Sequence, residues 1–189
     1  DKKKRLVAVS PAPAPLFGGV NGADSANSLS VFVNAGDCAG SMALESILSK
    51  LPDTAATKKS IAVDVTEEEK GLFPDPENIV GPAMIADGDF VLTSATAIAR
   101  YLAKMTQASS LALLPTAAKD NAKCEALIEL FHHANVDEVV TRVEKALEGA
   151  NDYVCGSTFT IADALLAAKL KTAKASVSAK AAHWMTLSL

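Results

Sequence analysis

A cysteine and a serine, Cys38 and Ser41, have the residue types and the spacing to carry out thiol chemistry. They enclose the segment CAGS, whose CxxS spacing is that of single-thiol redox proteins. If Cys38 opens a helix at Ala39, the backbone N–H groups of the first turn favour its thiolate, which is the reactive form. No Lys, Arg or His stands near Cys38 in the sequence, so a small residue without a chemical role is the competing interpretation.

Other candidate groups point to packing rather than chemistry. Cys124 and Cys155 fall on apolar stretches and are expected in the core. His132 and His133 end a predicted helix, where a positive charge suits the helix dipole, and the sequence offers no further ligands to complete a metal site with them. The motifs GxGxxG, GxxxxGK(S/T) and GxSxG are all missing, which leaves nucleotide-binding and hydrolase functions without support.

The composition excludes several classes of protein. The chain has 189 residues, a formal net charge of −4 and three cysteines. The acidic balance argues against a general nucleic-acid surface, because phosphate binding needs a positive footprint. An odd number of cysteines without a CxxC pair argues against a disulfide framework and favours a reducing compartment, which we take to be the cytoplasm, with an organelle as the alternative. No run approaches the roughly 20 apolar residues that span a bilayer.

Residues 1–28 differ in kind from the rest. They begin with the basic run Lys2 to Arg5, continue through PAPAPLF, and are dominated by Pro, Gly, Ser and Ala without any period. This pattern predicts a flexible, basic and Pro-rich extension that has no core of its own. A nuclear import signal, a phosphate-contacting arm and the remnant of a targeting segment are the other interpretations of the basic run.

The pattern of residues 29–106 predicts an α/β module. LSVFV, residues 29–33, is a strand, and the apolar stripe of residues 41–51 indicates a helix that packs on the sheet. The alternation of residues 61–65 indicates a second strand. A strand–helix–strand unit sets the two strands parallel through a right-handed crossover.

A hairpin and a helix follow in the sequence. Met84-Ile85 and residues 90–92 are the two apolar runs of the hairpin, and Asp87-Gly88 supplies its turn. Either Thr93 or Ser94 then offers a side-chain oxygen that caps the next helix.

Residues 112–189 are predicted to be wholly helical. Apolar residues recur at helical spacing in two stretches, and a further helix begins at Thr160. Asp163, three residues on, completes a capping box in which Asp stands where Glu or Gln is usual. We interpret the locally basic character of the last part as a solvated face. The lysines concerned are Lys169, Lys171, Lys174 and Lys180.

Three motifs in this order resemble the glutathione-transferase superfamily. GPAMIADGDFVLTSATAIARYL resembles the hairpin and helix of its thioredoxin-like domain, DYVCGSTFTIADAL resembles its signature YLVG…T-x-A-D, and AHWM resembles the R-W near its last helices. The resemblance covers residues 29–189 and implies a thioredoxin-like α/β module followed by an all-α domain. It also places Pro82 where the family keeps a cis-proline.

The resemblance implies a glutathione site that has lost its main contacts. In the family, an acidic or amide residue followed by Ser holds the γ-glutamyl end of glutathione. Aligned with this pattern, SATAIARYL puts Ser94 at the acidic position and Ala95 at the Ser position. Neither residue supplies a carboxylate, and the loss of a charge-assisted bond costs on the order of 1.5–3 kcal/mol. We therefore predict a vestigial glutathione site at Pro82, Ser94 and Ala95.

An enzymatic alternative stays open. The family places Tyr, Ser or Cys near the first strand to activate the glutathione sulfur, and no Tyr precedes Tyr101 in this sequence. Cys38 and Ser41 are the substitutes that remain. The alternative function is thus a glutathione-dependent transferase or thiol reductase that uses Cys38, with glutathione as its cofactor.

The Ser94-Ala95 replacement resembles the non-catalytic, translation-associated members of the superfamily. These are the GST-like domains appended to aminoacyl-tRNA synthetases, to multisynthetase scaffold proteins and to the gamma subunit of elongation factor one. We predict a protein–protein interaction domain without a cofactor, which forms a homodimer or heterodimer with another GST-like domain or a translation-complex protein. Arg100 and Lys104, one turn apart on the outer side of a helix, are the predicted interface residues. A GST-like accessory subunit of an organellar assembly is a further alternative.

Overall fold

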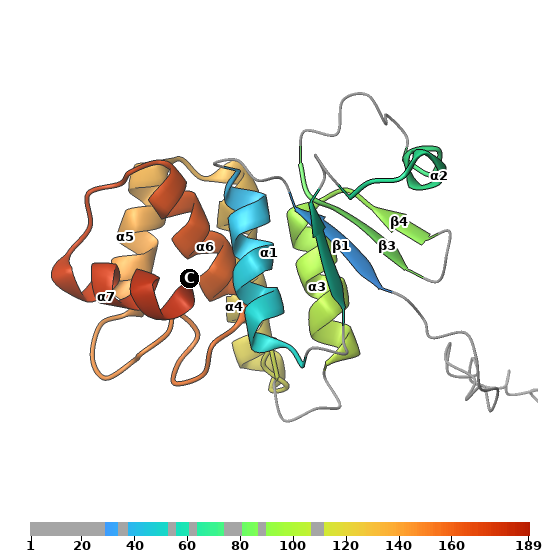
Figure 1. Cartoon of the computed structure of the whole chain (residues 1–189). Helices are drawn as coiled ribbons and strands as arrows, with labels where there is room; N and C mark the ends of the chain where they lie inside the picture. Colours follow the sequence, from blue (N-terminus) through green and yellow to red (C-terminus); the bar gives the residue numbers. More distant parts are fainter. Residues whose placement is uncertain are drawn as a thin grey trace, which may run out of the picture.

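The computed structural model describes residues 29–33, 38–52, 56–60, 64–73, 81–86, 90–106 and 112–189, shown in Figure 1. The elements of the first part are β1 (Ser30–Val33), α1 (Ala39–Lys50), β2 (Thr57–Ser60), α2 (Glu67–Lys70), β3 (Ala83–Ala86), β4 (Phe90–Leu92) and α3 (Ala95–Met105). The second part consists of α4 (Ala118–His133), α5 (Val136–Ala146), α6 (Ile161–Thr172) and α7 (Ala179–Ser188). This order confirms the predicted fold class, an α/β thioredoxin-like module followed by an all-α part. The predicted extension, residues 1–28, lies outside the described residues.

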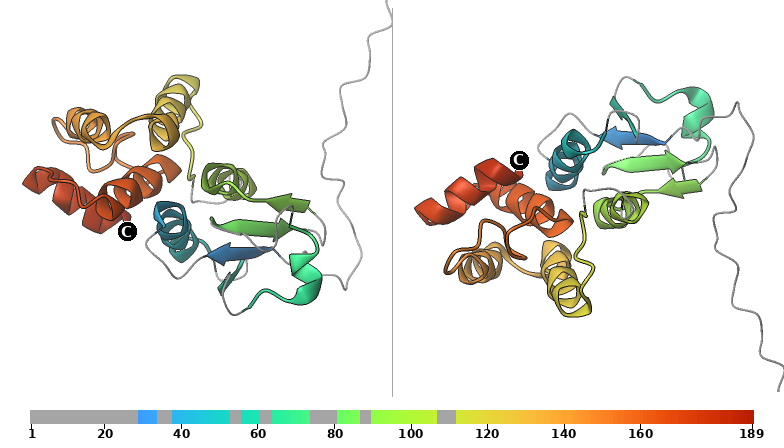
Figure 2. Two further views of the ribbon diagram at one scale, coloured as in Figure 1. Left: turned by 90° about the horizontal axis from the view of Figure 1, so that it is seen from above. Right: turned by 90° about the horizontal axis from the view of Figure 1, so that it is seen from below.

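Strand β1 lies inside the sheet, and both of its faces are buried. The strand order is β2-β1-β3-β4, with β1 parallel to β2, as predicted, and antiparallel to β3. Val31 and Val33 belong to the main core together with α1 and α3, which lie on one side of the sheet (Figure 2). Phe32 belongs to a second cluster and packs edge-on against Phe73, with ring centroids 5.8 Å apart. The apolar run of this strand therefore reflects burial on two faces rather than one.

The second strand begins four residues earlier than predicted. β2 covers Thr57–Ser60, whereas the alternation of the sequence indicates residues 61–65. Residues 61–63 lie outside the described residues, and Asp64 belongs to a turn. β2 is at the edge of the described sheet, so its backbone pairs on one side and polar side chains suit it. The described strand thus precedes the predicted one, and of the predicted residues only Asp64 and Val65 are described and lie outside a strand.

Two ion pairs explain why a polar segment serves as β2. Lys58 pairs with Glu45 of α1 at 2.5 Å, and Lys59 pairs with Glu69 of α2 at 2.7 Å. The hydrogen bond from Lys59 lowers the pKa of Glu69 below its usual range. These contacts connect the edge of the sheet to the helices on both sides of β2 in the sequence.

The predicted hairpin and the helix after it are confirmed. β3 and β4 pair antiparallel with Ile85 opposite Val91, and the turn residues 87–88 lie outside the described residues. α3 begins directly after Ser94, as predicted, but the Ser94 hydroxyl makes no capping bond to the backbone. Its oxygen lies 3.1 Å from the hydroxyl oxygen of Thr96 instead. The prediction that a side-chain oxygen of Ser94 caps α3 is therefore wrong, because the Thr96 hydroxyl competes for the Ser94 hydroxyl oxygen.

The peptide bond between Gly81 and Pro82 is trans, so the cis bond that the resemblance implies is wrong. Trans is the lower-energy form of an X–Pro bond by about 0.5–1 kcal/mol. In this form the Pro82 ring already packs beside Gly40 in the first turn of α1.

Helix α6 is the interior helix of the second part. It packs against α1, α4, α5 and α7, and every residue from Ile161 to Ala168 is buried. A helix that is buried all round is apolar all round, and in this stretch Asp163 is the single charged residue. None of the helices in the described residues has both the length and the apolar character needed to cross a membrane.

The carboxylate of Asp163 is completely buried and accepts hydrogen bonds on both oxygens. Oδ2 accepts from the backbone N–H and the hydroxyl of Thr160, at 2.8 and 2.7 Å, which confirms the predicted capping box. Oδ1 accepts from the backbone N–H of Val154 and from the indole N–H of Trp184, both at 2.8 Å. The cap of α6 therefore also holds the loop before it and helix α7.

Two of the late lysines close helix ends. Lys169 Nζ donates to three backbone carbonyls at the end of α4, at 2.7 to 3.0 Å. Lys180 Nζ donates to two backbone carbonyls at and just after the end of α5. A cation at a helix C-terminus satisfies the last carbonyls and complements the helix dipole. The interpretation of the whole basic group as a solvated face is therefore wrong for Lys169 and Lys180.

Replacing Thr160 with Ala should lower the free energy of unfolding by about 1–2 kcal/mol, because the buried Oδ2 of Asp163 loses a donor. The matched control is Thr158→Ala, at an exposed position two residues earlier, which should change stability by less than about 0.5 kcal/mol. Urea denaturation followed by circular dichroism measures both values. Equal effects of the two substitutions would contradict the role of Thr160 in the cap.

Candidate functional site at the first turns of helices α1 and α3

The first turns of α1 and α3 meet at Pro82. A Cβ atom added to Gly40 would lie 2.9 Å from the Cβ of Ala95 and 3.3 Å from the ring of Pro82. Carbon atoms pack best at about 3.5–4.0 Å, so this approach of the two helices depends on glycine. The structure thus brings together Pro82 and Ala95, two of the three residues of the predicted vestigial site, and both are buried.

Cys38 and Ser41 differ in their exposure. Cys38 is the N-cap of α1, as predicted, and its C=O accepts the N–H of Met42 at 3.1 Å. Its side chain is half-buried, and among the described residues it is the one cysteine at a helix N-terminus. Ser41 is only 1% exposed, so a ligand at the surface does not reach it. Helical geometry thus turns Ser41 into the core, and a role for it beside Cys38 stays a prediction.

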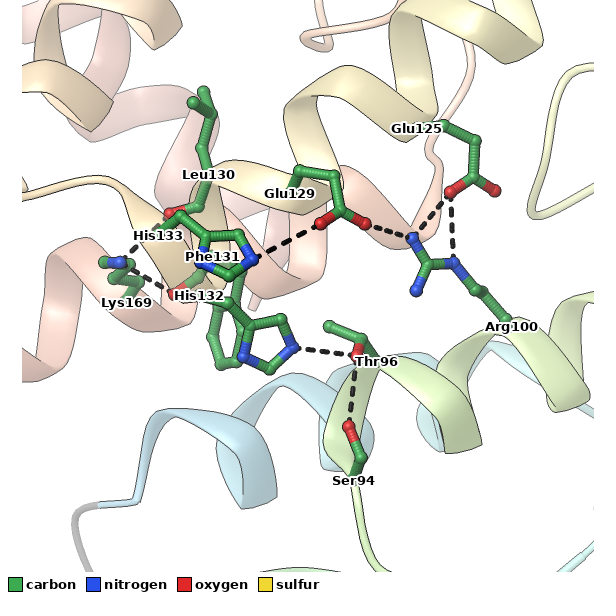
Figure 3. A network of polar contacts seen from close by, with 10 residues as sticks. All are labelled: Ser94, Thr96, Arg100, Glu125, Glu129, Leu130, Phe131, His132, His133 and Lys169. Atoms are coloured by element: carbon green, nitrogen blue, oxygen red, sulfur yellow. Dashed lines mark hydrogen bonds and ion pairs between the residues drawn. The ribbon is translucent and has the colours of Figure 1, made fainter.

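A chain of polar side chains leads from the start of α3 to the end of α4, as Figure 3 shows. Ser94 Oγ lies 3.1 Å from Thr96 Oγ1, which in turn lies 2.8 Å from Nε2 of His132. Thr96 is buried and His132 is exposed. Sequence reasoning identified His132 only as a helix end and missed Thr96. The signal for Thr96 was a second hydroxyl just after the predicted cap.

Arg100 is bonded within the chain and joins α3 to α4 (Figure 3). Its Nε and Nη2 donate to Oε2 of Glu125 at 3.0 and 2.7 Å, and Nη2 also donates to Oε1 of Glu129 at 2.9 Å. The bond to Glu125 raises the pKa of Arg100, and the same guanidinium lowers the pKa of Glu129. Arg100 is therefore already paired within the chain, with its side chain 30% exposed. A partner contact through Arg100 or through Lys104, which is exposed, stays a prediction.

The thiols of Cys124 and Cys155 interact with one another. This interaction lowers the pKa of Cys124 and raises the pKa of Cys155. Cys124 is buried, which confirms its predicted place in the core, whereas Cys155 is half-buried at the surface of the helical part. Both are free thiols.

Among the described residues, the arrangement at α3 offers hydrogen bonds but no unpaired negative charge. The first turn of α3 contains no acidic residue. The carboxylates of Glu125 and Glu129, on the facing side of α4, are both bonded to Arg100. In the part of the chain that the structure describes, no group of three or more His, Cys, Asp or Glu side chains is placed to hold a metal ion. The described residues of the site can thus bind a neutral polar group, but none of them supplies an unpaired carboxylate for an ammonium.

No family model and no curated protein matches this chain. Solved structures match it over most of its length. A glutathione transferase homologue from Burkholderia gl BGR1 with bound glutathione is 19% identical, with 84% of this chain and 90% of that chain covered and a TM-score of 0.62. Isozyme E7 of glutathione S-transferase from Drosophila melanogaster is 19% identical, with 85% and 86% covered and a TM-score of 0.61. This chain has the glutathione S-transferase fold.

An epsilon-class glutathione S-transferase from the housefly, Musca domestica, gives the same result at 18% identity, with 85% of this chain and 87% of that chain covered and a TM-score of 0.62. At such identities the glutathione S-transferase fold is established and the activity is not. The function of this chain therefore has to be argued from the side chains at Pro82, Ser94 and Ala95.

Arg100→Glu should destabilise the protein, because it removes the paired bonds and sets a third carboxylate beside Glu125 and Glu129. We expect the free energy of unfolding to fall by about 1–2 kcal/mol, with a larger loss at low ionic strength. Lys104→Glu, one turn later on the same helix and exposed, is the matched control and should change stability by less than about 0.5 kcal/mol. Urea titrations at two salt concentrations measure both effects. If Arg100→Glu is as stable as the control, the ion pairs do not hold α3 to α4.

Proposed function

We propose that this chain is a non-catalytic GST-like domain that assembles with another folded protein. The observation that carries the proposal is which side chains stand at the start of α3 and what they contact. Ser94 stands where the resemblance places an acidic residue, and its hydroxyl is already bonded to Thr96. Ala95, at the position of the family's Ser, is buried against the first turn of α1. A bound γ-glutamyl group would thus lose both of its usual side-chain partners.

Without these two side-chain contacts the free energy of glutathione binding is smaller, which favours a role other than glutathione chemistry. A charge-assisted hydrogen bond contributes on the order of 1.5–3 kcal/mol, which corresponds to about a tenfold or greater loss of affinity. The ammonium of glutathione would also be desolvated without an unpaired carboxylate beside it in the described residues.

The outer side of α3 and the adjacent strand β4 offer a surface for assembly. Phe90 of β4 is 45% exposed and stacks on Tyr101 of α3, with ring centroids 5.6 Å apart. Met105, one turn further along α3, is 48% exposed. Aromatic residues and Met are enriched in protein–protein interfaces, and Lys104 next to them is positioned at the rim. We therefore propose a contact surface centred on Phe90, Tyr101 and Met105, next to the predicted interface residues Arg100 and Lys104.

The proposed partner is a second GST-like domain or another component of the protein-synthesis machinery. This part of the proposal rests on the resemblance of SATAIARYL to the translation-associated domains. The net charge of −4 agrees with a protein partner rather than nucleic acid. The cytoplasm is the proposed compartment, because three free thiols suit reducing conditions.

Cys38 supports a second candidate function, a glutathione-dependent transferase or thiol reductase. Its half-buried thiol stands at the N-cap of α1. Gly40, in the first turn of the same helix, packs beside Pro82, one residue of the predicted glutathione site.

Calorimetric titration with glutathione should show no saturation at low millimolar concentration. The double substitution Ser94→Glu with Ala95→Ser restores the acidic-Ser pair and should raise the affinity, because Glu supplies the missing carboxylate. Binding of glutathione by the unaltered chain at tens of micromolar would overturn the non-catalytic proposal. A thiol-transfer activity that Cys38→Ser removes would establish the second candidate instead.

Substitution of the exposed apolar surface should abolish assembly without unfolding the domain. An affinity-tagged chain that carries Phe90→Glu and Met105→Glu should lose its partner in co-purification while keeping its melting temperature, because charges at the centre of an interface are costly to desolvate. Leu72→Glu and Leu187→Glu are matched controls, since these leucines are similarly exposed at 37% and 39%. Mass spectrometry identifies the partner. A partner that is retained by the double variant, or lost equally with the controls, would contradict the proposed surface.

A further inference from the structure

Two of the three cysteines of the chain lie together in the helical part. Cys124, on α4, is completely buried, whereas Cys155 is half-buried in the loop that leads to α6. Cys124 belongs to the main core, Cys155 packs against that core, and the two thiols interact with one another. They stand far apart in the sequence, so the packing of the loop against α4 is what brings them together.

A tight turn holds Cys155 in place. The backbone N–H groups of Tyr153 and Gly156 each donate to the carbonyl of the other, at 2.9 and 3.1 Å, and Cys155 lies between them. The backbone N–H of Val154 donates to the buried carboxylate of Asp163 at 2.8 Å. The loop is thus ordered before any reaction takes place, so bringing the two thiols together has no further cost in conformational entropy.

The two thiols differ in their access to solvent. Cys155 lines a groove of about 460 Å³ between α4, α5 and the loop at 151–156. Residues that flank Cys124 along α4, Lys123 and Leu127 among them, line the same groove, whereas Cys124 is itself buried. A small reagent in the groove therefore meets the sulfur of Cys155 before that of Cys124, and exposure is one of the conditions for oxidation of a thiol.

We propose that Cys124 and Cys155 form a redox site, in which a hydroperoxide converts the two thiols into an intramolecular disulfide. With hydrogen peroxide, the Cys155 sulfur attacks one oxygen, so that an S–O bond forms, the O–O bond breaks, and the other oxygen leaves with the thiol proton as water. The Cys124 sulfur then attacks the sulfenic acid on Cys155. The S–S bond forms, the S–O bond breaks, and the departing hydroxide takes the Cys124 proton as a second water.

The pKa shifts of the two thiols suit these roles. The interaction with Cys155 lowers the pKa of Cys124, which favours the thiolate that the second step needs. The same interaction raises the pKa of Cys155, so the first step is slow and calls for a high peroxide concentration. Disulfides in a reducing compartment are usually transient and redox-sensing, so the bond would form under oxidative stress and be reduced afterwards. This inference does not depend on the proposed assembly function, because neither cysteine lies on α3 or β4.

The test treats the reduced chain with millimolar hydrogen peroxide and counts the thiols after denaturation. The count should fall from three per chain to one, and dithiothreitol should restore it. A non-reduced tryptic digest should contain two peptides joined through Cys124 and Cys155, in at least about tenfold excess over any peptide joined through Cys38, because the fold holds the first two thiols together. In a chain unfolded by urea this preference should be lost, and all three pairings should occur.

Three variants separate the steps. Cys124→Ala removes the second nucleophile and should leave a sulfenic acid on Cys155, which dimedone labels. Cys155→Ser, at the half-buried position, should abolish the disulfide and leave the buried Cys124 as a thiol, so it provides the same comparison if Cys124→Ala does not fold. Cys38→Ser is the matched control and should leave the yield of the Cys124–Cys155 link within about twofold of the original chain. Circular dichroism melting curves show which variants are folded.

The proposal is overturned by any of three results. Peroxide may leave all three thiols of the folded chain unreacted, or the link may join Cys38 to another cysteine or one chain to a second chain. A link between Cys124 and Cys155 that forms with the same preference in the urea-unfolded chain would likewise show that the fold does not set up the pair.

Discussion

The buried carboxylate of Asp163 accepts hydrogen bonds from three different segments, and the helical half of the protein is organised around it. Taking such a group out of water costs several kcal/mol, and burial raises the pKa of Asp163. The donors from Thr160, Val154 and Trp184 offset that cost only when all of them are in place. The start of α6, the loop before it and the position of α7 are therefore determined together rather than one by one.

Helix α6 connects the Asp163 network to the rest of the molecule through its contacts with other helices. Its buried face packs on α1, which lies on the sheet, and its Lys169 holds the last carbonyls of α4. The last turn of α4 carries His132, which bonds to Thr96 at the start of α3. The hydroxyls of the candidate site are thus positioned from the helical side as well as from the hairpin that precedes α3.

The sequence predicted those elements whose pattern follows from burial. The hairpin and α3 were predictable because the spacing of their apolar residues matches the side of each element that faces the core. The cap of α6 was predictable because a Thr–Asp pair three residues apart, placed before an apolar run, is typical of a helix N-terminus. The strand at Thr57–Ser60 was not predicted because it pairs through its backbone and through the ion pairs of Lys58 and Lys59, neither of which leaves an apolar pattern.

The candidate site was predictable in its residues but not in their contacts. Ser94, Ala95 and Pro82 were found from the resemblance, whereas the bond from Thr96 to His132 joins residues 36 positions apart. The ion pairs of Arg100 could not be predicted for the same reason. Its partners on α4 stand 25 and 29 residues further along the chain, and helical spacing within α3 alone contains no information about them. Polar pairs between α3 and α4 depend on how the α/β module packs against the helical part. The sequence pattern within a single helix does not determine that packing.

The two edges of the described sheet are protected unequally. β2 carries two lysines, and a charged edge resists the addition of a further strand from another molecule. β4 consists of Phe90, Val91 and Leu92 and carries no charge, and Phe90 is exposed. An edge strand without charges is a template for strand addition, so aggregation of the isolated chain should increase with protein concentration through pairing at this edge. A bound partner that covers α3 and β4 would then act as a protection against aggregation as well as a binding partner.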